Sequence, residues 1–436
     1  MGKDASGKTV AKNAAALYLV QFVSFLIPIA EVSVLARSLG IEIYGQILFC
    51  QALALTGSLL VEYGFNINAA QQVAVHRKHP GELRELFTQI MLAKIMLAFP
   101  FVLLLLVAWT LGLLDNYVPS GQLLLFVLAY FVAFGFSPMW YFQGIERMAF
   151  PAMLDVALRL SGLTVLIIIV HTPDDFYMAL PLLAIPPVLN TGLTLYWAGH
   201  LVGRLPAVSI RDAWRQIRQG FHFFVYRSAS NLALSAVPVL LGVSAGQRAV
   251  GEFAPPEKLI KGMTSLALPF LTAIFPFFAR EFHPDGERQG AASYKQPMLV
   301  IALIGAIALI GSAVGLWLGP WVLDALLGTH VPESLSVYYV LIGLVPLRII
   351  NQSIALVLLI PAGRAQSCSY AISFFSIAGL LAGAWLATRQ GGYGMAWGLL
   401  ICEILLWLVL MMIATGLIMS SSANVKGAST DQIDRL

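Results

Sequence analysis

Long apolar runs follow one another along almost the whole chain, and they decide what it can fold into. A helix needs about 20 apolar residues to cross the hydrocarbon core of a bilayer, and only helices or closed barrels satisfy every backbone group there. The runs here are too long and too continuous for barrel strands. We therefore predict an all-α polytopic membrane protein with about twelve transmembrane helices. The predicted spans are 13–35, 43–62, 88–112, 121–142, 150–170, 177–199, 222–245, 253–278, 297–318, 335–360, 365–387 and 392–418.

The composition indicates that lipid is part of the solvent. Of the 436 residues, 59% are hydrophobic and 11% are charged, whereas a soluble domain carries about 25% charged residues. A water-soluble fold of this size could not hide so much apolar surface. Cys50, Cys368 and Cys402 all fall within apolar runs, so we interpret them as small buried hydrophobic residues rather than as a disulfide framework or metal site.

The positions of the basic residues predict the orientation of the spans, because cytoplasmic segments are enriched in Lys and Arg. With a cytoplasmic N-terminus, seventeen basic residues fall in inner segments and three in outer segments. The inner ones are Lys3, Lys8, Lys12, Arg77, Lys78, Arg84, Arg147, Arg204, Arg211, Arg215, Arg218, Arg280, Arg288, Lys295, Arg364, Lys426 and Arg435, and the outer ones are Arg37, Arg248 and Arg389. A shift by one span would destroy this asymmetry, so we predict that both termini are cytoplasmic.

The longest polar connection, Leu201–Gly220, divides the predicted spans into six and six. We therefore predict two lobes, 1–220 with a basic cytoplasmic linker and 221–436, which suggests an internal repeat of the kind found in transporters. The linker is basic and contains Trp214. It either lies as an amphipathic helix on the anionic inner leaflet or is a solvated connection.

Two features of the sequence carry no expected chemistry. Residues 2–9, Gly-Lys-Asp-Ala-Ser-Gly-Lys-Thr, match a phosphate-binding loop, but that loop works only between a strand and a helix, so we expect no ATP site. The seven histidines show no ligand spacing, so no metal site is expected. No cofactor, nucleic-acid partner or catalytic residue is predicted, and we do not expect an enzyme.

Six basic residues fall within the predicted spans, where each charge costs about 2.5–3.5 kcal/mol or more unless it faces a cavity or a partner. They are Lys94, Arg159, Arg227, Lys258, Lys261 and Arg348. We expect Lys94 to extend its amine to the inner interface. Asp155 and Arg159 are spaced i,i+4, so they can neutralise each other.

The spans also contain acidic residues, of which Glu31 and Glu403 are candidates for ion coupling. Burial raises the pKa of a carboxyl, so Glu403 could titrate as a coupling group. An ion pair with Arg348 or another cation is the equally weighted structural alternative. The excess of cations within the spans favours an anionic passenger, because pyrophosphate binds arginine and lysine.

Four segments resemble a known family. The first is Asn13…Gln21…Pro28…Leu35-Ala-Arg37-Ser-Leu39-Gly40…Tyr44-Gly45, and the second is Glu62-Tyr63-Gly64-Phe65-Asn66…Ala69-Ala70…Val73-Ala74. The third is Val250-Gly251-Glu-Phe253…Glu257-Lys258…Phe275-Pro276…Arg280, and the fourth is Gly391-Gly392-Tyr-Gly394-Met-Ala396-Trp-Gly398…Glu403. In this order they resemble Wzx-type polysaccharide flippases of the multidrug/oligosaccharidyl-lipid/polysaccharide exporter superfamily. Pro256 stands where the family usually has alanine.

The resemblance implies two six-helix lobes around a central cavity in the bacterial inner membrane, and alternating, ion-coupled access to the two sides. The implied substrate is an undecaprenyl-pyrophosphate-linked oligosaccharide unit, with membrane lipids and the polysaccharide polymerase machinery as further partners. Candidate substrate-binding residues are Arg37, Arg159, Arg227, Lys258, Lys261 and Arg348. Arg37 corresponds to the family's arginine before the Leu-Gly turn.

Other functions are compatible with a chain of this kind. A multidrug exporter of the same superfamily would have the same architecture, although the basic bias among the buried charges favours an anionic substrate. A membrane glycan polymerase usually presents a large periplasmic loop, and the longest outer loop expected here, near Gly319–Ser334, is short.

Overall fold

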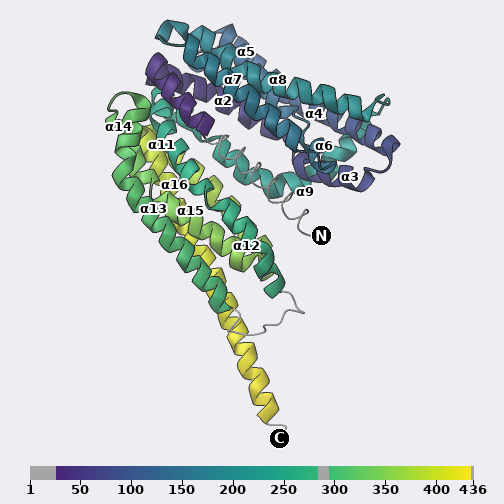
Figure 1. The fold of residues 1–436 in the computed structure, drawn as a ribbon, viewed down its shortest axis with the longest axis vertical. Helices are drawn as coiled ribbons and strands as arrows, with labels where there is room; N and C mark the ends of the chain where they lie inside the picture. The colour runs from purple at the N-terminus through teal and green to yellow at the C-terminus, as the bar shows by residue number, and fades with distance from the viewer. Residues whose placement is uncertain (1–25, 283–293, 434–436) are drawn as a thin grey trace, which may run out of the picture. The chain divides into compact units, whose positions relative to one another are not determined.

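The protein is helical throughout the part of the chain that the structure describes. The computed structural model describes residues 26–282 and 294–433, apart from the side chains of 222–223, 225–234 and 420–433. All regular secondary structure in these residues is helical (Figure 1). Nine helical segments among them are long and apolar enough to cross a membrane. The chain is therefore a multi-pass helical membrane protein, as the apolar runs predict.

The described chain forms two compact units. Unit 1 is the chain up to Gly251 together with Leu326–Thr329, and unit 2 is the rest. The helices of unit 1 are 26–39, α2 (Ile41–Glu62), α3 (Phe65–His76), α4 (Pro80–Thr110), α5 (Gly121–Gly135), α6 (Met139–Gly144), α7 (Ala149–Ile169), η1 (Pro173–Asp175), α8 (Phe176–Val202), α9 (Ile210–Ser235) and α10 (Val237–Ala245). Then α11 (Gln247–Ser265) leads into unit 2, with α12 (Leu268–Glu281), α13 (Lys295–Leu327), α14 (Pro332–Leu341), α15 (Leu344–Ser353), the π-helix η3 (Ile354–Leu359) and α16 (Ala365–Ile433). The predicted division after Gly220 falls within α9, and the two-lobe arrangement stays a prediction.

The difference between nine segments and twelve predicted spans has three sources. Most of the first predicted span, 13–35, lies outside the described residues. The seventh, 222–245, falls on α9 and α10, which are not among the nine segments. The eleventh and twelfth are both contained in Ala365–Met419, which counts as one segment. The total of twelve stays a prediction.

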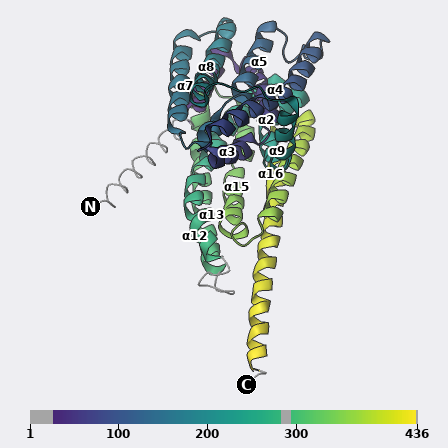
Figure 2. The same cartoon turned by 90° about the vertical axis from the view of Figure 1, so that its right-hand side faces the viewer.

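The segment α16 is two helices joined by a sharp turn. Gly391 has φ 59° and ψ −141°, which is not helical. The two helices on either side of Gly391 pack closely against each other. A Cβ added to Gly398 would overlap the backbone of Gly383, and one added to Gly379 would lie 3.1 Å from Cβ of Cys402. The second half then continues as a long helix, drawn in yellow in Figure 2. Gly379 and Gly383, like Gly394 and Gly398, are four residues apart, a spacing typical of close helix contact. The packing of the two helices explains it.

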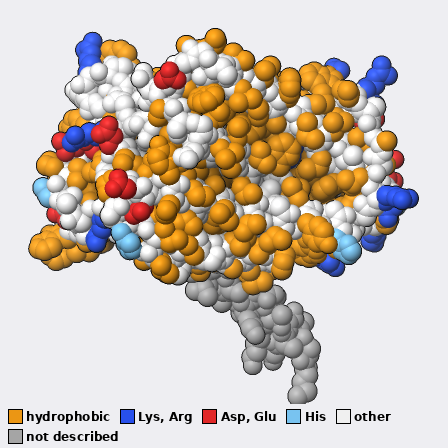
Figure 3. Space-filling model, turned by 90° about the horizontal axis from the view of Figure 1, so that it is seen from above, with side chains coloured by type: hydrophobic (Ala, Val, Ile, Leu, Met, Phe, Trp, Pro, Cys, Tyr) orange, Lys and Arg blue, Asp and Glu red, His pale blue; other side chains and the backbone are white. Residues whose placement is uncertain are grey.

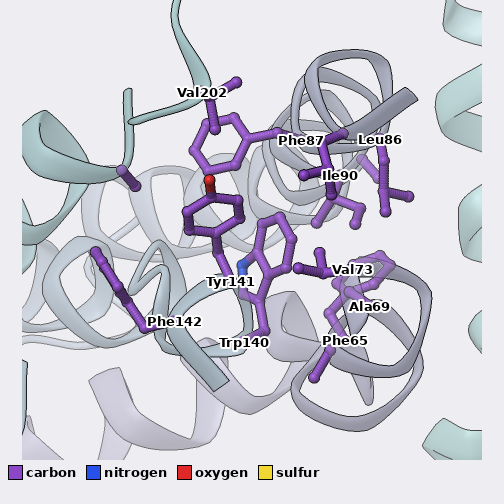
Figure 4. Packing of buried hydrophobic residues seen from close by; sticks show 14 of the residues in the cluster. Phe65, Ala69, Val73, Leu86, Phe87, Ile90, Trp140, Tyr141, Phe142 and Val202 are labelled. Carbon is purple, nitrogen blue, oxygen red and sulfur yellow. The ribbon is translucent and has the colours of Figure 1, made fainter. Parts of the chain in front are cut away.

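Unit 1 buries an aromatic core and exposes an apolar surface. Trp140, Phe142 and Phe87 are almost fully buried and pack with residues of α3, α4, α8 and α9 in one cluster (Figure 4). By contrast, almost none of the apolar span of α7 is buried. One face of the molecule shows hydrophobic side chains across its middle and charged side chains toward its edges (Figure 3). This distribution fits a protein whose middle faces lipid.

The predicted basic linker ends in an amphipathic helix. The first turns of α9 bury Ala213 and Ile217 and leave Trp214 exposed. Ser209 caps this helix, since its hydroxyl accepts from the Asp212 amide (3.2 Å) and donates to the Asp212 carboxylate (2.6 Å). The hydrogen bond from the Ser209 hydroxyl to the carboxylate, with a second one from the Ser209 amide (3.3 Å), lowers the pKa of Asp212. Residues 210–220 are therefore helical, with Ala213 and Ile217 packed in the core of unit 1, and the placement of this helix on the inner leaflet stays a prediction.

We expect Gly398→Ala to lower the stability of unit 2, because the new methyl group has no space against Gly383. Overpacking of this kind costs about 1–3 kcal/mol. Gly416→Ala is the matched control: Gly416 lies in the same helix with open space around its Cα, and Ala is a better helix former by about 1 kcal/mol. Thermal unfolding of the purified protein in detergent measures both. A midpoint for Gly398→Ala at or above that of Gly416→Ala would contradict the hairpin packing.

Candidate functional site

Breaks in two spans bring polar side chains together inside unit 1. The first break separates α2 from α3, where Tyr63 has φ 46° and Gly64 has φ 77°. A left-handed conformation is uncommon for tyrosine and is typical of functional or strained positions. The break lies between Glu62 and Asn66, and both side chains line the same cavity.

This cavity, which we call the unit 1 cavity, has a volume of about 370 Å³ and lies among α2, α3, α5, α6, α7 and α8. Its polar lining includes Glu62, Asn66, Asp155, Arg159 and Asn190. Polar groups in the middle of apolar spans are costly unless they face a partner or a cavity. The unit 1 cavity is therefore the principal candidate site of unit 1.

Arg159 and Asp155 form an ion pair in the wall of the unit 1 cavity, with 2.9 Å between Nε and Oδ2. The pairing that their i,i+4 spacing predicts is thus present. Asn190 donates to Asp155 Oδ1 (3.2 Å), and the guanidinium of Arg159 lies 6.0 Å from the ring centroid of Phe134. The Asp155 carboxylate thus has two partners, Arg159 and Asn190, and the Arg159 guanidinium also lies beside an aromatic ring.

Lys94 is fully buried, so the expectation that its amine reaches the inner interface is wrong. Its Nζ donates to the carbonyl oxygens of Gly135 (2.9 Å) and Ser137 (3.2 Å). Gly135 ends α5 and Ser137 lies in the connection to α6, so no continuing helix supplies donors for these carbonyls. Lys94 also interacts electrostatically with Glu62. The break in the chain therefore supplies the partners that a lysine in a span needs.

Glu31 lies within the same part of unit 1. Its charge acts on the hydroxyl of Tyr130, as do the charges of Asp155 and Arg159. Gln51 donates to that hydroxyl (2.9 Å). Tyr130 thus connects the ion-coupling candidate Glu31 electrostatically with the pair beside the unit 1 cavity.

Unit 2 contains a second polar group, formed by Arg348, Asn351 and Glu403. Arg348 Nε lies 3.6 Å from Glu403 Oε2, and both side chains are about four-fifths buried. Asn351 donates to Glu403 Oε1 (2.8 Å). The π-helix η3 follows directly, and such widened turns are frequent at functional sites. The ion pair considered as the structural alternative for Glu403 is present, while its role in coupling stays a prediction.

Arg37, Lys258 and Lys261 are not among the lining residues of the unit 1 cavity. The exposed Lys261 pairs with the mostly buried Glu257 (2.9 Å) on α11, and Lys258 is partly buried. Arg37 Nε donates to the carbonyl of Leu326 (3.1 Å) and holds the end of α13. The side chain of Arg227 lies outside the described part of the structure.

Sequence reasoning did not single out Glu62 and Lys94 as partners. The signal that could have found them is the Ser137-Pro138 step inside an apolar span, because a helix broken within lipid must find donors for its open carbonyls. Among the described residues, no group of three or more His, Cys, Asp or Glu side chains could hold a metal ion.

The fold is similar to the folds of two solved membrane transporters. Over 93% of this chain it is similar to the structure of the lipid II flippase MurJ in an inward closed conformation, covering 90% of that chain at a TM-score of 0.65 and 11% identity. Over 91% of this chain it is similar to an inward-facing multidrug resistance MATE family transporter of the MOP superfamily, covering 96% of that chain at a TM-score of 0.63 and 15% identity.

The chain belongs to the Polysaccharide biosynthesis protein family, whose pattern matches residues 10–282, more than half of the chain. It is 26% identical over 317 residues to a "Putative O-antigen transporter" of Escherichia coli K12, covering 70% of this chain and 74% of that protein. It is 25% identical over 414 residues to a protein of the same description from Shigella dysenteriae, covering 92% and 98%. The resemblance seen in the four sequence segments is thereby confirmed.

We expect Lys94→Met to destabilise the protein strongly, because it leaves the carbonyls of Gly135 and Ser137 and the charge of Glu62 without their partner. Removing one member of a buried pair costs about 3–5 kcal/mol. The double variant Lys94→Met/Glu62→Gln removes both charges and should recover part of the loss. Thermal unfolding of the two single variants and the double variant gives the coupling. If the effects of the two substitutions simply add, the two side chains do not interact.

Proposed function

We propose that this protein is a flippase that moves an undecaprenyl-pyrophosphate-linked oligosaccharide unit from the cytoplasmic to the periplasmic leaflet of the bacterial inner membrane. The observation that carries the proposal is that the chain belongs to the Polysaccharide biosynthesis protein family, matched over residues 10–282. The chain also has charged groups inside its spans. The names of the two relatives point to O-antigen as the cargo class.

The charges inside the spans support an anionic passenger. Arg159 and Arg348 are each paired with a carboxylate, which keeps the cation inexpensive in the absence of substrate. A pyrophosphate group offers the same bidentate acceptor geometry with more negative charge. Exchange of the internal carboxylate for the substrate phosphate would then couple binding to rearrangement of the helices that carry the pair. Lys258, Lys261, Arg37 and Arg227 are the further candidates for contact with the substrate.

Ion coupling through Glu403 and Glu31 is part of the same proposal. Protonation of Glu403, or its occupation by a cation, would release Arg348 for the substrate, while loss of the ion would restore the pair. A ligand can shift a conformational equilibrium only through its different affinity for the two states, and this exchange supplies such a difference. Both termini are proposed to be cytoplasmic, no ATP is proposed to take part, and the polysaccharide polymerase machinery is the proposed downstream partner.

We expect Arg348→Ala, and likewise Arg227→Ala, to abolish surface glycan in a strain that lacks the chromosomal copy, beyond any loss of protein abundance that the unpaired Glu403 causes in Arg348→Ala. The reason is that each substitution removes a cation available to the pyrophosphate. Surface glycan on gels and the amount of membrane-inserted protein are measured together. Arg364→Ala is the control, because Arg364 is exposed and outside the spans.

Full complementation by both variants would overturn the cationic-site part of the proposal. The same strains distinguish the superfamily's other activity. If the protein is a flippase, its loss leaves drug susceptibility unchanged, and the cells without surface glycan accumulate the lipid-linked unit on the cytoplasmic side. Increased drug susceptibility with normal surface glycan would instead identify a multidrug exporter.

A further inference from the structure

A second pocket of unit 1 opens at the end of the helices where α3 turns into α4. It has a volume of about 440 Å³, which is within the range of small-molecule sites. Four cations line it: Arg77 and Lys78 from the turn between α3 and α4, Arg84 from α4, and Arg147 from the α6–α7 connection. No carboxylate is among its lining residues. We call it the basic pocket.

The geometry of the basic pocket is held by the backbone. Arg84 Nε donates to the carbonyl of Val202 (2.9 Å), at the end of α8. Gly203, the next residue, has φ 80°, a conformation that L side chains rarely adopt, and a Cβ there would lie 3.5 Å from Arg84 Nη2. The carbonyl at the end of α8 thus holds the guanidinium of Arg84 beside the pocket.

The wall of the pocket is continuous with the aromatic core. Tyr141 lines the pocket and is almost fully buried, with its ring edge-on to Phe87 at 5.5 Å. Figure 4 shows its hydroxyl oxygen on the side of Val202, and the charge of Arg147 acts on it. The hydroxyl of Tyr141 and the guanidinium of Arg84, which the Val202 carbonyl holds, therefore lie at the same rim of the pocket.

The net charge of the basic pocket is positive. Arg77 is paired with Glu146 (3.1 Å), and both side chains are largely exposed, so the pair contributes little and can exchange partners. Glu82, in the first turn of α4, faces His76 at 3.4 Å. Lys78, Arg84 and Arg147 remain as three cations, and arginine fits phosphate through two parallel hydrogen bonds.

An apolar surface continues from the rim of the pocket. Leu201 lines the pocket and is exposed. Trp197 lies one turn before it on α8 and its ring contacts Phe150 (centroids 4.5 Å apart). Phe150 is exposed, as is Met153 one turn further along α7. This stripe leads from a cationic pocket along a surface that faces lipid, which a soluble phosphate would not use.

We propose that the basic pocket binds the phosphate headgroup of an anionic phospholipid, whose acyl chains lie along Leu201, Trp197, Phe150 and Met153. The predicted orientation places this end of unit 1 in the cytoplasmic leaflet, where basic pockets between transmembrane helices bind such headgroups. The site is separate from the unit 1 cavity and does not depend on what the protein transports.

The test is a titration of the purified, delipidated full chain with phosphatidylglycerol or with phosphatidylcholine of the same acyl chains, followed by native mass spectrometry. We expect at least tenfold tighter binding of phosphatidylglycerol. Lys78→Gln/Arg147→Gln should weaken this binding by about 25-fold, or fivefold for each charge. Both side chains are exposed, so the fold and the melting temperature without lipid should be unchanged.

Arg364→Gln is the control for removal of a positive charge elsewhere, and it should bind phosphatidylglycerol as the wild type does. A second readout is stabilisation, because a lipid that binds only the folded state raises its melting temperature. Phosphatidylglycerol should raise the melting temperature of the wild type and of Arg364→Gln more than that of the double variant. Equal binding of the two lipids, or equal binding by the double variant and Arg364→Gln, would overturn the proposal. Displacement of phosphatidylglycerol by an equal concentration of inorganic phosphate would assign the pocket to a soluble anion instead.

Discussion

An ionised side chain is costly in hydrocarbon unless another group compensates its charge, and the interior of both units is organised around this requirement. Asp155 lies against Arg159, Glu403 against Arg348, and Lys94 against two open carbonyls. Each of these partnerships joins groups that the surrounding apolar residues could not satisfy. Because a lost partner cannot be replaced by water, the pairs restrict how the helices can pack and mark where they can rearrange.

The Lys94 and Arg348 partnerships occur where helices are interrupted, whereas Asp155 and Arg159 lie within the continuous helix α7. Glu62 ends α2 at a left-handed turn, Lys94 closes the gap before Pro138, and Arg348 and Asn351 precede a π-helix. Helix breaks within a membrane leave backbone groups that need partners, and discontinuous helices of this kind form the binding sites of many transporters. The same interruptions therefore create both the need for polar side chains and the space in which a polar passenger could be held.

The family and the fold agree on the general class of this protein, while the charges suggest its chemistry. Structures with little sequence identity share its fold over more than nine-tenths of the chain, and the family match identifies polysaccharide biosynthesis. The two cationic regions of unit 1 differ in setting. One is a paired arginine inside a cavity, and the other is a group of exposed cations at the end of the helices. We propose that the first binds cargo and that the second, which continues along Leu201, Trp197, Phe150 and Met153, binds an anionic lipid.

The sequence by itself determined the helical membrane class, most span positions and the family. Apolar run length and the order of short motifs depend on residues close together in the chain, and so does the Asp155–Arg159 pairing, which follows from helical spacing. The tertiary structure alone decided that Lys94 is buried rather than extended to the interface, because its partners come from a break forty residues away. It likewise decided that Glu403 meets Arg348 and that Val202 orients Arg84 at the basic pocket. Contacts between distant helices depend on packing, which the periodicity of a single helix does not encode.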